Sequence, residues 1–128
     1  MKILDLELSR YYADLIRAQP NSSFLNAWKI VKRGFVKGKT PLYVEGYIFH
    51  EGQATPHGWI EVGDQVVDAT LIDEANVYFP GPRYSYIQLC AAMGDINSLP
   101  IYPRFIDGCI AARLFTSAQA AALEHQAN

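Results

Sequence analysis

The residue types best able to do chemistry together are a histidine and an aspartate on the two arms of a predicted β-hairpin, His57 and Asp68. The arms are residues 57–62 and 65–70, and the Gly63-Asp64 pair between them favours a two-residue turn. That turn places residue 62 opposite 65, and therefore 57 opposite 70 and 59 opposite 68. His57 and Asp68 are then diagonal neighbours on one face, about 7–8 Å apart at the backbone, a distance that an imidazole and a carboxylate can span.

Such a pair can act as a general base together with the group that orients it. An aspartate that accepts a hydrogen bond from one imidazole nitrogen fixes the tautomer and favours imidazolium when the other nitrogen takes a proton. The pair then requires only a nucleophile. Each residue also has a structural interpretation, because His57 could be a half-buried packing residue and Asp68 could cap the turn that follows it.

Two amphipathic helices are predicted before the hairpin. Apolar residues recur every three or four positions from Leu4 to Gln19, and Pro20-Asn21-Ser22-Ser23 then ends the pattern. A second helix follows over Phe24–Arg33 and ends at Gly34. Residues 42–49 are rich in β-forming types and predict a strand.

The part of the chain after the hairpin is predicted to be mostly loop, because residues 71–108 hold four of the seven prolines. A short strand or helix is expected around Tyr86–Met93, and a last helix is expected to begin at Thr116 or Ser117. Helices followed by an antiparallel sheet predict an α+β fold, and 128 residues predict a single domain over 1–128.

Three segments resemble one known superfamily. His57-Gly58-Trp59-Ile60-Glu61-Val62, followed by Val67-Asp68-Ala69-Thr70, resembles the His–Asp half of the transglutaminase-like (papain-like) proteins. Ser23-Phe24-Leu25-Asn26-Ala27 is similar to the Cys-aromatic-x-Asn-Ala segment that opens the nucleophile helix in small bacterial and phage members, and Tyr43–Tyr47 resembles the strand between them. The match covers about residues 20–72. The resemblance implies a papain-like α+β fold and acyl transfer at an amide, by peptide or isopeptide hydrolysis, deamidation or transamidation.

The chain departs from this pattern at the nucleophile, since Ser23 stands where the family has cysteine. A helix N-terminus lowers the pKa of a thiol and offers free N–H groups to an oxyanion, but a serine hydroxyl there still needs full general-base help. We therefore expect little or no turnover. Three explanations remain open: an engineered replacement of cysteine, a natural loss that leaves a non-catalytic binding protein, or a working Ser-His-Asp triad. The structural alternative is that Ser23 is a plain helix N-cap.

The resemblance assigns catalytic roles to Ser23, His57 and Asp68 and substrate-binding roles to Asn26 and Trp59. Trp59 also fits core packing beside the imidazole, and Asn26 also fits a surface position on its helix. Gln19 precedes Ser23 and is a candidate donor to the oxyanion. Cys109 could be the nucleophile of a circularly permuted site, although a free cysteine is more often a small buried hydrophobe. Cys90 is a weaker candidate for that role.

Composition and charge exclude several classes of protein. Half of the residues are hydrophobic and 19% are charged, which excludes a disordered chain, and a net charge of −2 argues against a nucleic-acid binder. No apolar run reaches the length of a membrane helix, Asp5 and Glu7 interrupt the start where a signal peptide would be apolar, and the two cysteines predict free thiols. His50 and His125 lack partners at metal-ligand spacing, and no nucleotide motif occurs. We expect a cytoplasmic protein without cofactor or metal that acts on a peptide, protein or small molecule.

Overall fold

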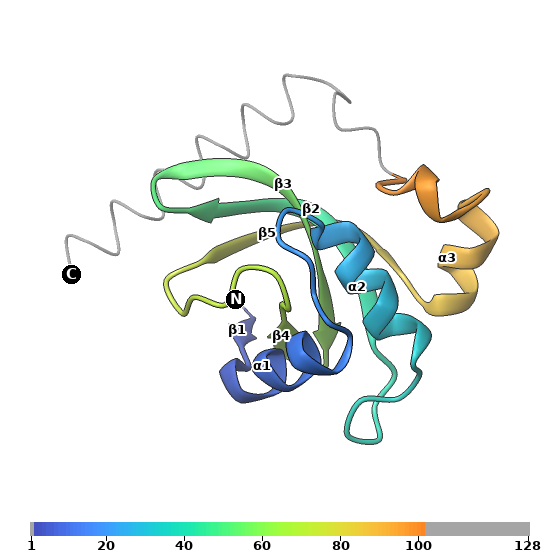
Figure 1. Ribbon diagram of the computed structural model, residues 1–128, viewed down its shortest axis with the longest axis horizontal. Coiled ribbons are helices and arrows are strands. Elements are labelled where there is room, and N and C mark those ends of the chain that lie inside the picture. The colour runs from blue at the N-terminus through green and yellow to red at the C-terminus, as the bar shows by residue number, and fades with distance from the viewer. Residues whose placement is uncertain (1, 102–128) are drawn as a thin grey trace.

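The computed structural model describes residues 2–101, in which a five-stranded mixed sheet runs in the order β1-β4-β3-β2-β5 (Figure 1). Its strands are β1 (Ile3–Leu4), β2 (Leu42–His50), β3 (Gln53–Val62), β4 (Gln65–Val67) and β5 (Val77–Tyr84). The helices are α1 (Leu6–Leu15), α2 (Ser23–Lys32), α3 (Tyr86–Ala92) and a 3-10 turn over Ile96–Ser98. The α+β class predicted from the sequence is confirmed.

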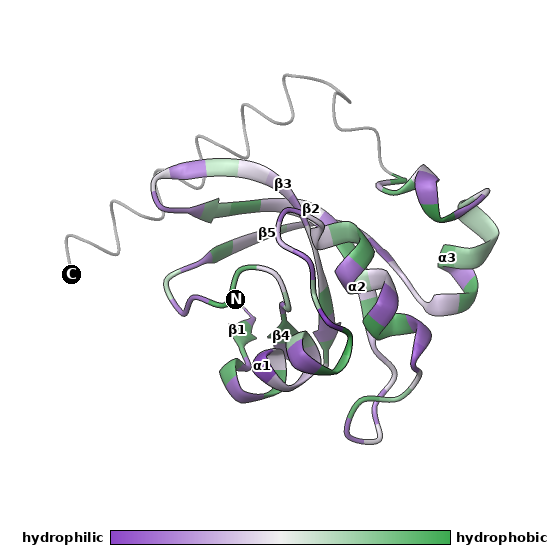
Figure 2. Cartoon of the chain, viewed as in Figure 1, coloured by the Kyte–Doolittle hydropathy of each residue, from purple (hydrophilic) through white to green (hydrophobic). Residues whose placement is uncertain are grey.

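The helices are distributed along the sheet. Helix α1 contacts β4 at one end of the strand order, α2 packs on β2 and β3 at the centre, and α3 contacts β2 and β5 at the other end (Figure 1). Helices α1 and α2 carry hydrophobic and hydrophilic residues side by side, as amphipathic helices do (Figure 2). Asp5 begins α1 by accepting a hydrogen bond from the Leu8 N–H at 2.9 Å.

The two faces of the sheet have separate apolar clusters, because successive residues of a strand point to opposite faces. Tyr43, Ile60 and Val67 belong to the main cluster, which includes the buried side of α2. Their neighbours Val44, Trp59 and Val66 form the second cluster, with Leu4 and Tyr78 packed against it. The second cluster therefore lies on the face opposite α2.

The predicted hairpin is confirmed in its register over three residue pairs, but its second arm, expected over residues 65–70, ends at Val67. Strands β3 and β4 pair Ile60 with Val67 and Val62 with Gln65, the pairing that the two-residue turn dictates. Gly63 has a φ of +60°, a backbone conformation that glycine adopts without strain. Strand β4 covers only the last three residues of β3, so the edge of β3 near residue 58 is left open to another partner.

Three expectations need correction. The chain begins with β1 before α1 starts at Leu6, and α1 ends at Leu15 and not at Gln19. Since β1 pairs in parallel with β4, the sheet is mixed and not purely antiparallel. Helix α2 starts at Ser23, one residue earlier than predicted. Of the strand and the helix that were the alternatives around Tyr86–Met93, the helix is confirmed as α3. The helix expected from Thr116 or Ser117 lies outside the described residues.

The largest error is β5, which falls within the stretch predicted to be loop. Its Pro80 and Pro82 were the reason for that prediction, since proline cannot donate to a β-ladder. The strand lies at the edge of the sheet and pairs only with β2, where the register shifts between Val44 and Gly46. An edge strand next to a bulge tolerates proline because one side of its backbone has no strand to bond.

Candidate functional site

The histidine and aspartate singled out in the sequence are in contact. His57 Nε2 lies 2.8 Å from Asp68 Oδ2, and both residues are buried. An ionised carboxylate only accepts, so the imidazole nitrogen donates and Nε2 carries the hydrogen. Nδ1 is therefore the ring nitrogen left to exchange a proton with another group. The contact predicted from the hairpin register is confirmed.

The Asp68 carboxylate has two further sets of donors. Its Oδ1 accepts from the backbone N–H groups of Thr70 and Leu71, at 2.9 and 3.1 Å. Its Oδ2 accepts from the Tyr78 hydroxyl at 2.7 Å in addition to His57. Asp68 thus makes both of the contacts expected of it: one oxygen caps the following turn, and the other holds the imidazole.

The hydroxyl of Ser23 faces β3 and does not cap its own helix. Ser22 occupies the N-cap position of α2, and Ser23 is the first residue of the helix. Ser23 Oγ accepts a hydrogen bond from the Gly58 N–H at 3.1 Å, at the edge that β4 leaves uncovered. The helix end therefore reaches the residue next to His57. The N–H groups of its first turn, at residues 23–25, have no intrahelical acceptor and can donate to an anion.

Gly58 permits this close approach. A Cβ at position 58 would lie 2.8 Å from Phe24 Cδ1 and 3.0 Å from Phe24 Cα. Any larger residue would push the start of α2 away from β3. The sequence places Gly58 between His57 and Trp59 but indicates no role for it, because its contact with Phe24 joins segments that lie far apart in the chain.

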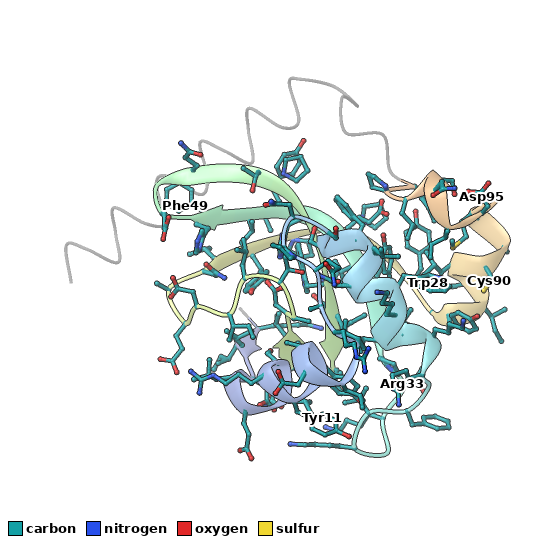
Figure 3. The ribbon with its side chains drawn as sticks, in the orientation of Figure 1. Tyr11, Trp28, Arg33, Phe49, Cys90 and Asp95 are labelled. Atoms are coloured by element: carbon teal, nitrogen blue, oxygen red, sulfur yellow. The ribbon has the colours of Figure 1, made fainter. Side chains whose placement is uncertain are left out.

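Ser23 and His57 line one cavity of about 780 Å³. Its walls come from the loop before α2, the start of α2, the start of β3, the residues after Asp68 and the segment after α3. The lining residues are Pro20, Asn21, Ser22, Ser23, Phe24, Leu25, Thr55, Pro56, His57, Thr70, Leu71, Ile96, Asn97, Leu99 and Pro100. Cys90 is exposed on α3 and is absent from this lining (Figure 3). Cys109 and His125 lie outside the described residues.

The two residues expected to contact substrate lie behind the cavity wall. Asn26 is buried, and its amide nitrogen donates to Gln19 O at 2.8 Å and to Thr70 Oγ1 at 2.9 Å. Its oxygen accepts from the Gln19 N–H at 3.1 Å. Asn26 therefore fastens the loop before α2 to the segment after Asp68. The Gln19 side chain donates to Arg17 O and does not line the cavity, so the geometry gives it no contact with an oxyanion there.

Trp59 is a core residue that supports the imidazole. It is buried, it is absent from the cavity lining, and its ring stacks on that of His57 with 6.2 Å between centroids and 25° between planes. Of the two sequence interpretations, core packing beside the imidazole is the one that the geometry matches. Tyr78 on β5, which sequence reasoning missed, packs edge-on against the same indole at 5.0 Å.

No known protein family, curated protein or solved structure matches the chain. Within residues 2–101, no group of three or more His, Cys, Asp or Glu side chains is arranged to hold a metal ion. The helices of that same part of the chain are too short or too polar to cross a membrane.

Proposed function

We propose that this chain is a small papain-like, transglutaminase-like domain whose cavity receives an amide-containing ligand, with position 23, His57 and Asp68 as its reactive centre. One observation carries the proposal: Ser23, the first residue of α2, and His57, which is hydrogen-bonded to the buried Asp68, line the same cavity. A nucleophile and an oriented base that act on one ligand need such a shared cavity. The residue pattern over about 20–72 gives the same assignment.

The chemistry is acyl transfer when the residue at position 23 is a cysteine. The thiolate attacks the amide carbonyl carbon, and the electron pair moves to the oxygen, which accepts from the first-turn N–H groups of α2. Imidazolium at His57 gives its Nδ1 proton to the departing amine as the C–N bond breaks. Water or a second amine, deprotonated by His57, then attacks the acyl-enzyme and releases the thiol, giving hydrolysis, deamidation or transamidation. Asp68 holds the ring throughout.

With serine at position 23 the same steps are much slower, because a hydroxyl is not ionised near neutral pH and needs full proton removal by His57. We infer that the chain as it stands binds its amide ligand and turns it over little. A non-catalytic binding role is the second candidate. It is favoured by the hydrogen bond of Ser23 Oγ, which joins it to the Gly58 backbone and not to the imidazole.

The proposal is tested by acylation of the Ser23→Cys variant with p-nitrophenyl acetate. The thiol at position 23 should displace p-nitrophenol in a burst and carry an acetyl group that intact-mass and peptide mapping locate. The Ser22→Cys variant is the matched control, since residue 22 lines the same cavity one position earlier but does not contact Gly58. Equal acylation of the two variants, or acylation only at other cysteines, would contradict the proposal.

A further inference from the structure

Four side chains around His57 form a closed ring of contacts. His57 is hydrogen-bonded to Asp68, and Asp68 to Tyr78. The ring of Tyr78 lies edge-on against Trp59, whose indole stacks on His57. The imidazole is thereby held by a hydrogen bond at Nε2 and by the indole over one face of the ring. Tyr78 contacts both groups that hold it, since its hydroxyl bonds Asp68 and its ring packs against Trp59.

The Tyr78 hydroxyl is well placed to fix the carboxylate. It donates to the same Asp68 oxygen, Oδ2, that accepts from His57, at 2.7 Å. Burial, and next to it the negative charge of Asp68, raise the pKa of Tyr78, so the hydroxyl keeps its proton and remains a donor. Asn76 Nδ2 donates to the Tyr78 oxygen at 3.4 Å, a long contact that leaves this donor role unchanged.

The pairing of β5 with β2 brings Tyr78 near Trp59 and His57. Tyr78 pairs with Ile48 of β2, two residues from Gly46, which pairs with His57. A Cβ at Gly46 would lie 2.8 Å from Trp59 Cη2, so glycine leaves the room that the indole occupies. The indole thus reaches both the imidazole and the phenol ring.

We propose that Tyr78 is a positioning residue for the His57–Asp68 pair: its hydroxyl holds the Asp68 oxygen that bonds Nε2, and its ring holds the indole that stacks on the imidazole. The proposal rests on the proposed function only in treating His57 as the proton-transfer group. Without the hydroxyl, Asp68 Oδ2 keeps His57 as its single donor. The orientation of the imidazole that leaves Nδ1 free for proton exchange is then held less firmly.

The direct test uses the chain with Ser23 in place. In the ¹H–¹⁵N NMR spectrum of His57, the Nε2–H proton should exchange with water slowly, and in Tyr78→Phe at least tenfold faster. Tyr84→Phe is the matched control on the same strand, since Tyr84 packs against Tyr43 and not against Asp68. Tyr78→Leu, which removes the ring as well, should also broaden the imidazole carbon signals. A merely structural role would change the melting temperature but not the exchange rate measured well below it.

The Ser23→Cys background gives the second readout. Adding Tyr78→Phe should reduce the iodoacetamide rate of the thiol at position 23 about tenfold at mildly acidic pH and bring its pH profile closer to that of an ordinary thiol. If Tyr78→Phe does not fold, 3-fluorotyrosine at position 78, a stronger donor, should slow Nε2–H exchange instead. Unchanged exchange in the folded Tyr78 variant overturns the inference. Altered exchange with an unactivated thiol at position 23 supports it while contradicting the proposed function.

Discussion

The two halves of the site are held in different ways. On the His57–Asp68 side, the carboxylate accepts four hydrogen bonds and the imidazole is stacked on a buried indole. On the Ser23 side, the helix end meets β3 through one hydrogen bond and a close contact that only glycine allows. The imidazole of His57 is therefore fixed by polar and aromatic side chains, whereas position 23 is fixed by the approach of two backbones.

The largest effect is expected from removing the carboxylate on the first side. Asp68→Ala leaves the donors of His57, Thr70, Leu71 and Tyr78 without their acceptor, and should lower the free energy of unfolding by about 3–5 kcal/mol. Urea unfolding measures this loss. Asp14→Ala, at an exposed aspartate of α1, is the control and should change stability by less than about 0.5 kcal/mol. A small effect of Asp68→Ala would show that this side is not held as described.

On the Ser23 side, the next largest effect is expected from a steric clash between β3 and α2. Gly58→Ala places a methyl group against Phe24 and should destabilise the protein by about 1–3 kcal/mol. In the Ser23→Cys background it should also cancel the fast acylation at position 23, because the helix end moves away from β3. Gly94→Ala, where a Cβ would meet nothing within 4 Å, is the matched control. An acylation rate unchanged by Gly58→Ala would contradict the close-approach account.

A smaller effect is expected at Asn26, which connects the two sides. Asn26→Ala removes the bonds to Gln19 and Thr70, and should cost about 1–3 kcal/mol in unfolding free energy by leaving buried groups unpaired. Because the Gln19 N–H donates to Asn26, amide exchange at Gln19 should become faster in the variant. Exchange that stays slow there would mean that the loop is held by other contacts.

The smallest effect is expected from an ion-pair cluster outside the site, which Glu61 of β3 forms with Lys2 and Arg83. Burial opposes ionisation of Glu61, but hydrogen bonds and charge from Arg83 and Lys2 outweigh it and lower the pKa of Glu61 below its ordinary 4.5. A depressed carboxyl pKa contributes stability that is present above about pH 4.5 and is lost as the pH falls through the folded value.

We expect that contribution to be about 1 kcal/mol, since both cations are partly exposed. Urea unfolding at pH 7 and pH 3 should show a smaller pH-dependent loss for Glu61→Gln than for the native chain. Acylation at position 23 should be unaffected in the Ser23→Cys background. An equal loss of stability in both proteins would contradict the assigned pKa direction.

Local features of the site could be predicted from the sequence, whereas contacts between distant segments could not. The register of β3 and β4 follows from a two-residue turn and the period of a strand, which are local properties. His57 and Asp68 lie just beyond the paired residues, so the same turn brings them close to each other. Tyr78 could not be placed because its strand contains two prolines and is stabilised by pairing with β2, thirty residues earlier. The roles of Gly58 and Asn26 depend on contacts with Phe24, Gln19 and Thr70 that no local pattern encodes.

The convergence of the two halves is tested most directly by measuring how the reactivity of a thiol at position 23 depends on His57. The Ser23→Cys variant and its Ser23→Cys/His57→Ala partner are alkylated with iodoacetamide over time at mildly acidic pH, and peptide mass mapping separates position 23 from Cys90 and Cys109. We predict that the thiol at position 23 reacts at least tenfold faster when His57 is present, because the imidazolium stabilises the thiolate. Equal rates in the two variants would contradict the claim that the histidine pair and the helix end form one reactive centre.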